Sequence, residues 1–342
     1  MNLGRLADMP RCQVATTETP LEPMDRLTAA NTGARLWVKR DDMQGLAFGG
    51  NKVRQLEYYF GAAQAAGADT VLITGAVQSN FCRLTAAYAA RLGMECHLQL
   101  EERVASNDPL YREGGNVLLD RLMGAHLHSY SVGEDEDGAD RALDELADDL
   151  TAKGRKPYVI HLSGAYPPLG ALGYIDCARE VLDQAAAQGI SFDHAVVASG
   201  SGATHSGFLF GLRALGCDIP VMGVCVRRDA SLQRPRIIGR CQQIADLLGM
   251  ENPVADADVV TNDRFYGPGY GRSNAPTERA IKLGARTEAL MLDPVYTGKC
   301  MAGALALAGN RPESENVLFL HTGGTPGIFA YANSLEPVLA AG

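Results

Sequence analysis

The sequence predicts an α/β protein in which doubly wound parallel sheets form two lobes. From Thr70 onward, short runs rich in β-branched residues alternate with longer segments rich in Ala and Leu, the pattern of parallel strands covered by helices. The chain has 342 residues, more than a single hydrophobic core usually organises. Three loops after the strand-like runs are rich in Gly, Ser and Thr. Ligands of doubly wound folds bind at the carboxyl ends of the strands, so we expect the chemistry in these loops.

Seven segments read as strands, and each is followed by a segment compatible with a helix. They are TVLITGAV at 70–77, ECHLQLE at 95–101, HLHSYSV at 126–132, PYVIHLSG at 157–164, HAVVASGSG at 194–202, VMGVCV at 221–226 and NVLFLHTGG at 316–324. No Pro-rich or Gly/Ser-rich linker separates the lobes. We expect a smaller domain at 55–163 and a larger one that combines 1–54 with 164–342, so that the N-terminal segment joins the C-terminal half.

The composition of the chain argues against nucleic-acid, metal and membrane partners. With 31 basic and 40 acidic residues the net charge is −9, which disfavours a nucleic-acid partner. The acidic stretch 133–150 reads as the solvated face of a helix with a charged loop before it. The eight cysteines include no C-x-x-C pair and no cluster at zinc-ligand spacing, so we expect reduced thiols and no metal site. Without a signal peptide or an apolar run of membrane-spanning length, a cytoplasmic protein with no membrane partner is expected.

The segment HAVVASGSGATHSG, from His194 to Gly207, reads as a strand, a turn of small residues and the start of a helix. Glycines allow a tight turn, and hydroxyls beside amides at a helix N-terminus suit a phosphate monoester. The expected phosphate contacts are Ser199, Gly200, Ser201, Gly202, Ala203 and Thr204. The pattern lacks the ending of a Walker loop and the third glycine of a dinucleotide fingerprint. Taken alone, it is explained equally well by a tight strand-to-helix turn.

Lys52 follows two glycines and an asparagine at the start of a helix-like run. If Asn51 caps that helix, the ammonium lies at the positive end of the helix dipole, which favours the neutral, nucleophilic amine. A lone lysine is usually an ordinary surface residue. Combined with a phosphate cradle, however, a nucleophilic lysine indicates pyridoxal 5′-phosphate (PLP), held covalently by Lys52 and anchored by its phosphate.

Three further segments supply candidate side chains. In VQSNFCR, Ser79 and Asn80 offer a hydroxyl and an amide suited to a substrate carboxylate and to the phenolic oxygen of the cofactor, although a helix N-cap explains the motif equally well. YGPGYGRSN and LDPVYTGKCMAG place Tyr270 and Tyr296 beside a glycine or close to one. An isolated buried tyrosine is more often a packing residue than an acid or a base.

Four motifs, KRDDMQGLAFGGNKVRQLE, GAVQSNFCR, VVASGSGATHSG and LDPVYTGKCMAG, together resemble the D-cysteine desulfhydrase and 1-aminocyclopropane-1-carboxylate (ACC) deaminase family. This family belongs to the fold-type II, tryptophan-synthase-β-like PLP enzymes and includes L-cysteate sulfo-lyases. The resemblance implies that Lys52 holds PLP and moves the proton at the reacting carbon. It also implies that Asn80 faces the phenolic oxygen and Ser79 the substrate carboxylate, with Thr322 among the cofactor contacts. Tyr270 and Tyr296 would line the substrate side as catalytic residues, and the larger domain would bind PLP.

One position separates members of the family. ACC deaminases resemble this chain in the DPVY run but typically follow the tyrosine with glutamate, whereas Thr297 follows Tyr296 here. A carboxylate beside the pyridine nitrogen keeps the ring a strong electron sink, while threonine offers only a neutral hydrogen bond. We therefore expect a reaction in which the substrate expels a group from its β carbon.

The chain also departs from the family pattern in ways that bear on the substrate. Phe81 stands where members typically carry histidine, HLSGAYP at 161–167 replaces a PVGGSN-like segment, and Arg272 appears in YGRSN. We expect His161, Ser163, Phe81 and Arg272 to contact the substrate. A charged side chain such as that of Arg272 reaches water by default, but turned inward it could pair with a sulfonate.

Three functional hypotheses follow. The first is a PLP-dependent carbon–sulfur lyase of the D-cysteine desulfhydrase or L-cysteate sulfo-lyase type, releasing pyruvate, ammonia and sulfide or sulfite. The second is an ACC deaminase or another small amino-acid deaminase. The third is a protein that binds PLP or an amino acid with weak turnover, because Phe81 stands where a polar residue is expected. The resemblance implies a homodimer.

Overall fold

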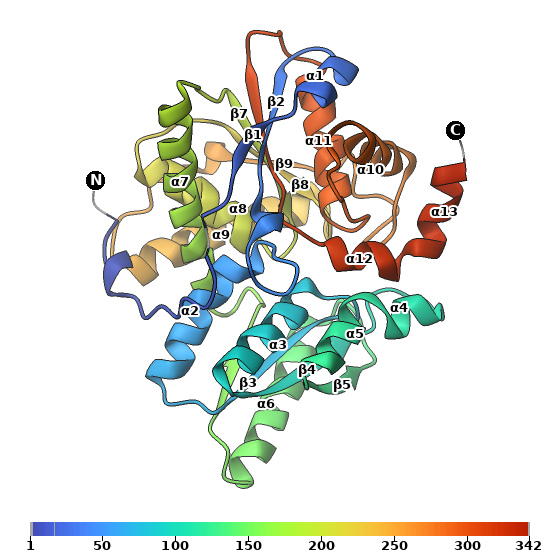
Figure 1. The fold of residues 1–342 in the computed structure, drawn as a ribbon. Coiled ribbons are helices and arrows are strands. Elements are labelled where there is room, and N and C mark those ends of the chain that lie inside the picture. Colours follow the sequence, from blue (N-terminus) through green and yellow to red (C-terminus); the bar gives the residue numbers. More distant parts are fainter. Residues whose placement is uncertain (1–2, 17, 341–342) are drawn as a thin grey trace.

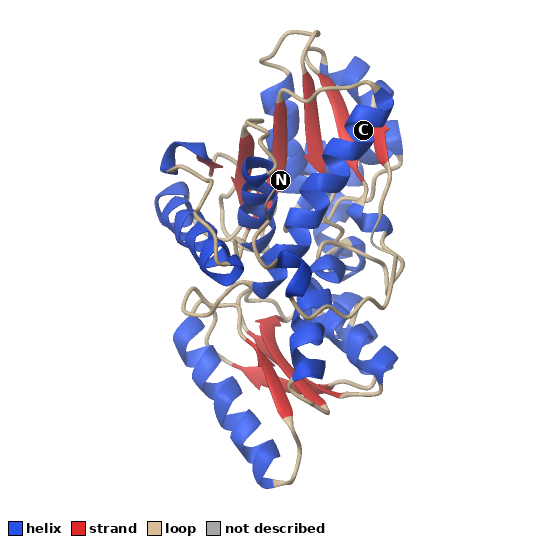
Figure 2. Cartoon of the chain, turned by 90° about the vertical axis from the view of Figure 1, so that its left-hand side faces the viewer, coloured by secondary structure: helices blue, strands red, loops and turns tan. Residues whose placement is uncertain are grey.

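The computed structural model describes residues 3–16 and 18–340, without the side chains of 337–340. Its α/β fold holds two separate sheets, one in each half of the molecule (Figures 1 and 2). Within the described residues, no helix is both long and apolar enough to cross a membrane. The α/β architecture with parallel sheets in two lobes confirms the fold class expected from the sequence.

The larger sheet has six strands in the order β1-β2-β10-β7-β8-β9. Their bounds are β1 Leu21–Pro23, β2 Arg35–Lys39, β7 His194–Ser199, β8 Val221–Cys225, β9 Val259–Asn262 and β10 Asn316–Leu320. All neighbours are parallel except β1, which runs antiparallel to β2. Because β2 pairs with β10, the N-terminal segment completes the sheet of the C-terminal half, as expected.

The smaller sheet has four parallel strands in the order β5-β4-β3-β6. Their bounds are β3 Thr70–Ala76, β4 Glu95–Glu101, β5 His126–Tyr130 and β6 Pro157–Ile160. All seven strand-like runs of the sequence contain a strand, while β1, β2 and β9 were not anticipated. These three strands have only three to five residues each.

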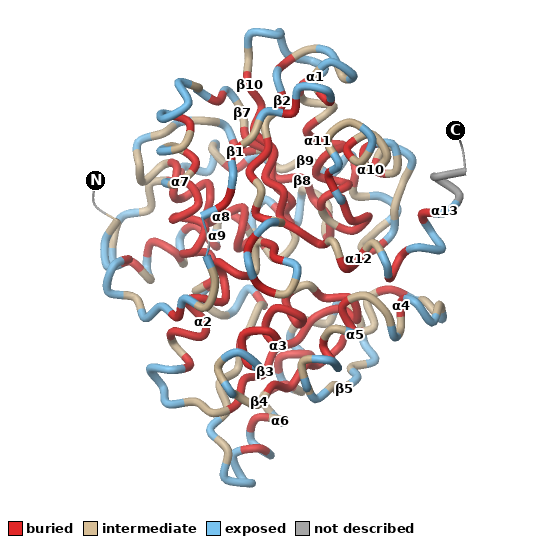
Figure 3. The backbone as a smooth tube through the Cα atoms, viewed as in Figure 1, coloured by how far each residue is buried: buried red, intermediate tan, exposed pale blue. Residues whose placement is uncertain are grey.

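Helices cover both faces of each sheet. Their bounds are α1 Asp25–Asn31, α2 Lys52–Ala65, α3 Asn80–Leu92, α4 Pro109–Glu113, α5 Gly115–Leu122, α6 Glu136–Ala152, α7 Leu172–Gln188, α8 Ala203–Ala214, α9 Ala230–Leu248, α10 Ala275–Glu288, α11 Thr297–Ala308, α12 Thr325–Ala330 and α13 Ala332–Ala340. On the larger sheet α7, α8 and α9 share one apolar core and α10 and α11 another. On the smaller sheet α2 and α3 pack on one face and α6 on the other. Buried segments therefore run through both halves (Figure 3).

Both sheets reverse their strand order near the middle, and these reversals position the site. In the larger sheet β10 lies beside β7 but on the opposite side from β8. In the smaller sheet β6 lies beside β3 but on the opposite side from β4. At such points the loops after neighbouring strands diverge and open a crevice at the carboxyl ends. The loops after β3, β6, β7 and β10 are therefore those that can form a ligand site.

The expected domain division stays a prediction in its details. The strands of the smaller sheet all lie within 55–163, and those of the larger sheet lie outside that range. A boundary between residues 54 and 55 would, however, divide α2, which is continuous from Lys52 to Ala65. The helix bearing the candidate lysine therefore belongs to neither half alone, since it contacts both α3 and α7.

Candidate active site

A pocket of about 850 Å³, including the part open to solvent, lies where the loops after β3, β6, β7 and β10 meet. Of the expected site residues it is lined by Lys52, Ser79, Asn80, Phe81, Gly200, Ser201, Gly202, Thr204, Tyr270, Tyr296 and Thr322. Residues from four sequence motifs thus converge on one cavity.

Lys52 is the first residue of α2, and its side chain reaches into this pocket. Nζ lies 3.4 Å from Oε1 of Gln55 and 4.8 Å from the centroid of the Phe81 ring. Burial lowers the pKa of Lys52 to about 7, because an ammonium loses its hydration there. A substantial neutral fraction at neutral pH is what a nucleophilic amine requires.

The expectation that Asn51 caps α2 is wrong. Asn51 has helical dihedral angles and its side chain forms no capping hydrogen bond. Instead its Nδ2 donates to Oγ1 of Thr204, 2.8 Å away. The low pKa of Lys52 accordingly comes from burial rather than from a capped helix end.

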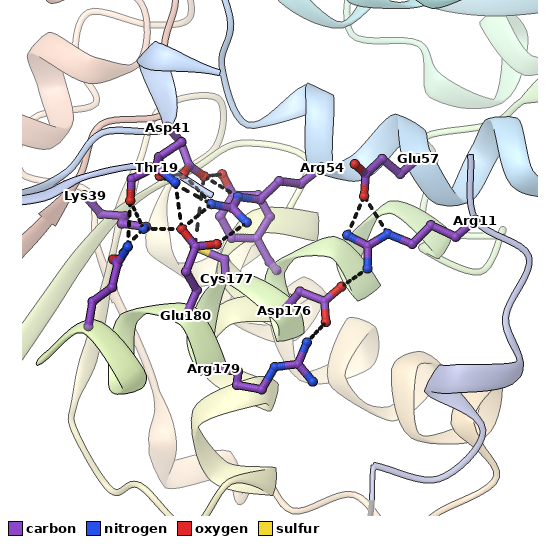
Figure 4. Close-up of polar contacts among 12 residues, drawn as sticks. Arg11, Thr19, Lys39, Asp41, Arg54, Glu57, Asp176, Cys177, Arg179 and Glu180 are labelled. Carbon is purple, nitrogen blue, oxygen red and sulfur yellow. Dashed lines mark hydrogen bonds and ion pairs between the residues drawn. The ribbon is translucent and has the colours of Figure 1, made fainter. Parts of the chain in front are cut away.

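A buried ionic network fixes the start of α2 from beneath (Figure 4). Arg54, two residues after Lys52, donates to both oxygens of Asp41 and also pairs with Glu180 of α7. Although burial disfavours the carboxylate, its ion pair with Arg54 lowers the pKa of Asp41. One turn further on, Arg11 joins Glu57 of α2 to Asp176 of α7. These pairs hold α2 against the larger half and set the position of Lys52.

The loop after β7 has the form of an anion cradle. Gly202 has φ = +101°, a left-handed conformation that favours glycine, and a Cβ there would meet Ile237 Cδ1 at 3.0 Å. It immediately precedes α8, whose N-terminal amides have no partner within the helix. Oγ1 of Thr204 accepts hydrogen bonds from Asn51 and Gln55, both 2.8 Å long. The hydroxyl hydrogen of Thr204 is then left to donate to a ligand.

Two arginines of the larger half donate hydrogen bonds to carbonyls of this loop. Nη1 of Arg228 donates to the carbonyl of Gly200 at 3.1 Å, and Nε of Arg236 donates to that of Ser201 at 2.8 Å. Carbonyls engaged in this way leave the amide N–H groups to face a phosphate, whose charge the arginines also favour. The cradle therefore fits the phosphate of PLP.

Two of the expected phosphate contacts lie behind the cradle and not on its surface. Ser199 is fully buried, with Oγ 2.8 Å from Nε2 of Gln233 and 3.1 Å from Nδ1 of His205. Neither Ser199 nor Ala203 contributes to the lining of the pocket. Because side chains alternate along a strand, the last residue of β7 directs its hydroxyl into the core.

Ser79 and Asn80 open α3 at the opposite wall. Oγ of Ser79 accepts from the amide of Cys82 at 3.2 Å, so the residue is an N-cap as well as a pocket residue. Oδ1 of Asn80 accepts from Nη1 of Arg83 at 2.9 Å and from Nδ2 of Asn116 at 3.1 Å. With its oxygen held in this way, Asn80 presents its NH2 group toward the cavity. An amide donor suits the phenolic oxygen expected there.

The two tyrosines form one unit on the substrate side. Their hydroxyls are hydrogen-bonded to each other, and their rings meet edge to face at 5.9 Å. Burial raises the pKa of both phenols, so both are neutral at physiological pH and can donate protons. The two tyrosine motifs in the sequence thus form one hydrogen-bonded pair, which neither motif predicts alone.

Thr297 lies one layer behind the pocket. Its Oγ1 donates to Oδ1 of Asp293 at 2.7 Å and accepts from the Asp293 amide at 2.8 Å, and it does not contribute to the lining. A threonine has one hydroxyl hydrogen, so in this arrangement Thr297 has none to offer a pyridine nitrogen. Thr322, which follows β10 closely, lines the pocket and is the better-placed donor.

Three expected substrate contacts lie outside the pocket. His161 faces Asp140 and Asp144 of α6 and stacks on Tyr166. Ser163 is buried but does not line the cavity. Leu162, which lies between His161 and Ser163 in the sequence, does line it. Arg272 is exposed and borders a neighbouring hollow that shares Tyr270 with the pocket. Long charged side chains favour water. The expectation that Arg272 reaches water therefore agrees with the structure better than the expectation that it turns inward.

Sequence reasoning missed two arginines that do line the pocket. Arg103 follows β4 and is held by Glu101 in a bidentate ion pair of 2.6 and 2.8 Å. Arg227 follows β8 and pairs with Glu134 and Glu136. Each lies two residues after the end of its strand, in the region where doubly wound folds place functional groups. That rule, applied to charged residues as well as to small ones, could have found them.

Nη2 of Arg227 is a buried donor that finds no hydrogen-bond partner among the described residues. The whole residue is only 8% exposed. A buried guanidinium donor without a partner is unfavourable by about 1–3 kcal/mol. Its presence at a pocket indicates an anionic ligand group.

Comparison with known proteins agrees with this geometry. A family model described as pyridoxal-phosphate dependent enzyme matches residues 13–323. The chain is 41% identical over 329 residues to a D-cysteine desulfhydrase of Yersinia pestis (strain Pestoides F), covering 96% of this chain and 97% of that protein. It is 41% identical over 336 residues to a 1-aminocyclopropane-1-carboxylate deaminase of Burkholderia vietnamiensis (strain G4 / LMG 22486), covering 97% and 98%.

The same relationship holds among solved structures. A crystal structure of an ACC deaminase homologue superposes with a TM-score of 0.87 at 34% identity, covering 97% of each chain. Lys52, the phosphate cradle and the carboxamide of Asn80 surround one cavity, and together they fit PLP. The match over nearly the whole chain and the fit of these residues lead to one conclusion: the chain belongs to the family of pyridoxal-phosphate dependent enzymes.

Proposed function

We propose that the chain is a carbon–sulfur lyase that eliminates a sulfur-containing group from the β carbon of a small amino acid. The products would be pyruvate, ammonia and either sulfide or sulfite. Support comes from relatives named D-cysteine desulfhydrase at 41% identity over nearly the full length.

The residues around the pocket have separable tasks in this reaction. The cradle from Gly200 to Thr204 would hold the phosphate of PLP, which, bound through Lys52, supplies an electron sink for the α carbon. Lys52, freed as an amine, would take the α proton. Ser79 would bind the substrate carboxylate, and the amide of Asn80 would donate to the phenolic oxygen of PLP. The C–S bond then breaks, its electron pair leaves with sulfur, and the released enamine hydrolyses to pyruvate and ammonia.

Arg227 is the residue that favours an anionic leaving group on the β carbon. Its buried Nη2 lacks a partner within the described chain, and Arg103 lines the same cavity. A sulfonate would satisfy that donor through a charge-assisted hydrogen bond, whereas a neutral thiol would not. We therefore favour an anionic β substituent such as that of cysteate, with Arg227 and Arg103 in the role first expected for Arg272.

The test compares substrates on one preparation. Keto-acid, sulfide and sulfite release are measured with both enantiomers of cysteine and cysteate and with ACC, for the wild type and Arg227→Gln. Arg227→Lys keeps the charge if the glutamine variant folds poorly, and the exposed Arg26→Gln serves as the matched control. Loss of one charge-assisted bond, about 1.5–3 kcal/mol, predicts a 10- to 100-fold drop in kcat/KM for cysteate, with cysteine much less affected.

Each result has a defined meaning. Equal effects of Arg227→Gln on cysteate and cysteine, or none, remove the sulfonate preference and leave D-cysteine desulfhydrase activity as the better account. Turnover of ACC alone would contradict the lyase proposal and favour the deaminase, the name carried by the Burkholderia vietnamiensis relative. Binding of PLP without turnover of any substrate would favour the binding-protein hypothesis. A cytoplasmic homodimer remains part of the proposal.

A further inference from the structure

Three histidines and a glutamate gather on one face of the smaller sheet. Glu95 and His97 lie two residues apart on β4, and His126 and His128 lie two residues apart on the edge strand β5. His97 is paired with His126 in the register. Because alternate residues of a strand point to the same side, all four side chains emerge together.

The donor atoms of three of these residues are already close. Oε1 of Glu95 lies 2.8 Å from Nε2 of His97 and 3.8 Å from Nε2 of His126. All three atoms lie within 4.8 Å of one another. Zinc bonds of about 2.0–2.1 Å in tetrahedral geometry require donors about 3.3 Å apart. Small side-chain rotations are enough to reach that spacing.

Two neighbours orient these ligands in the way metal sites require. Nδ1 of His97 is 2.9 Å from Nε2 of His128, and Oε2 of Glu95 is held by Nη2 of Arg155 at 2.6 Å. Metal-bound histidines and carboxylates are usually held by such second contacts. Bound metal would replace the hydrogen between His97 and Glu95, leaving Nδ1–H of His97 to donate to His128.

The chemistry of the donor atoms indicates which metal the cluster suits. Nitrogen ligands favour zinc, copper or nickel over magnesium and calcium, which prefer oxygen.

We propose that Glu95, His97 and His126 form a binding site for a divalent transition metal, represented by Zn²⁺, with water completing the coordination. The site is independent of the pocket, because Glu95 and His126 begin their strands, whereas the pocket lies at the carboxyl ends. At about 3.3 Å per residue, the seven-residue strand β4 separates the two by roughly 20 Å. A metal there would join the edge strand β5 to β4 and stabilise the smaller half.

The test measures zinc binding by the full-length, PLP-loaded protein without an affinity tag. Zn²⁺ alone is titrated in competition with a chromophoric chelator. His126→Gln removes one ligand at a site whose side chain is 58% exposed, so the fold should be retained. His194→Gln, on β7 of the other sheet and paired with Glu315, is the matched control.

We expect the wild type and His194→Gln to bind one zinc per chain with equal affinity. His126→Gln should bind at least tenfold more weakly, and His128→Gln, which removes only a supporting contact, should bind more weakly by about tenfold or more. Zinc should raise the melting temperature of the wild type but not of His126→Gln, and Mg²⁺ should raise neither. Absence of zinc binding in the wild type, or equal affinity in His126→Gln, would overturn the proposal.

Discussion

Nζ of Lys52 lies 4.8 Å from the centroid of the Phe81 ring. The aromatic face stabilises the ammonium, while burial destabilises it and lowers its pKa to about 7. Phe81 stands where the resembling family typically carries histidine. An apolar ring at this place gives the lysine no proton acceptor, so the ionisation of Lys52 depends on burial, on the ring and on its contact with Oε1 of Gln55.

Replacing the ring should therefore shift the ionisation of Lys52. In Phe81→Leu the lost cation–π contact, about 1 kcal/mol, should lower the apparent pKa by roughly 0.5–1 unit. The measurement is the pH dependence of the rate at which cofactor-free protein takes up PLP, because only the neutral amine reacts. Phe329→Leu, at a ring that is 63% exposed on α12, should leave the profile unchanged. An unchanged profile for Phe81→Leu would show that the ring does not influence the amine.

The buried amine should also affect stability in a pH-dependent way. Lys52 titrates near pH 7 in the folded protein and near 10.5 when unfolded. Between these values the unfolded state binds the additional proton, so the free energy of unfolding rises with pH; below pH 7 the full cost of burial is present. In cofactor-free protein Lys52→Met should raise stability by about 1–3 kcal/mol at pH 6.5.

That gain should shrink as the pH approaches 10. Melting temperatures at pH 6.5 and 9.5 provide the measurement, and Lys153→Met at the exposed end of α6 is the control. A gain for Lys52→Met that is the same at both pH values would mean that ionisation of the amine is not its cause.

The sequence predicted the α/β architecture, because it depends on local patterns, while phosphate binding by the loop from Gly200 to Thr204 stays a prediction. Seven strand-like runs and the loop from Gly200 to Thr204 are visible in consecutive residues. Arg103 and Arg227 were missed because a charged side chain in a loop after a strand usually reaches water, and only the fold brings these two into the pocket. Arg272 and His161 were wrongly expected in the pocket for a related reason, because the direction of their side chains depends on loops and on α6. The cluster on β4 and β5 was missed because its residues meet only through strand register.

Arg83 should orient the side chain of Asn80 for its contact with PLP. It is fully buried on α3 and donates to Asn80, to Asn116 and to the carbonyl of Gly49 close to Lys52. Arg83→Lys keeps the charge but loses the planar fork, and we expect about tenfold weaker PLP binding, or about 1.4 kcal/mol. Equilibrium binding of PLP measures this. Arg91→Lys, exposed on the same helix, should bind PLP normally, and equal affinity in the two variants would contradict the role of Arg83.

Asp41 should be essential for the stability of α2. Removing one partner of a buried ion pair usually costs about 3–5 kcal/mol, and Asp41→Asn leaves Arg54 with weaker partners. The pKa of Asp41 is lowered, so its contribution is present above the unfolded value near 4 and is lost as the pH falls through the folded value. The melting temperature of Asp41→Asn should fall strongly at pH 7. The exposed Asp183→Asn on α7 should change little, and a similar small change for Asp41→Asn would show that the network is dispensable.

The tyrosine pair should act as one unit in turnover. Because the hydroxyls of Tyr270 and Tyr296 are bonded to each other, removing either one deprives the other of its partner. Loss of proton transfer typically lowers kcat by 10²- to 10⁴-fold, and groups acting as a unit are not additive. Tyr270→Phe and Tyr296→Phe should therefore lower kcat by similar factors, with the double variant little worse than either. Tyr166→Phe, whose ring stacks on His161 outside the pocket, should retain full activity. If the effects of the two variants multiply in the double variant, the hydroxyls act separately; normal activity in both would make the pair a packing element.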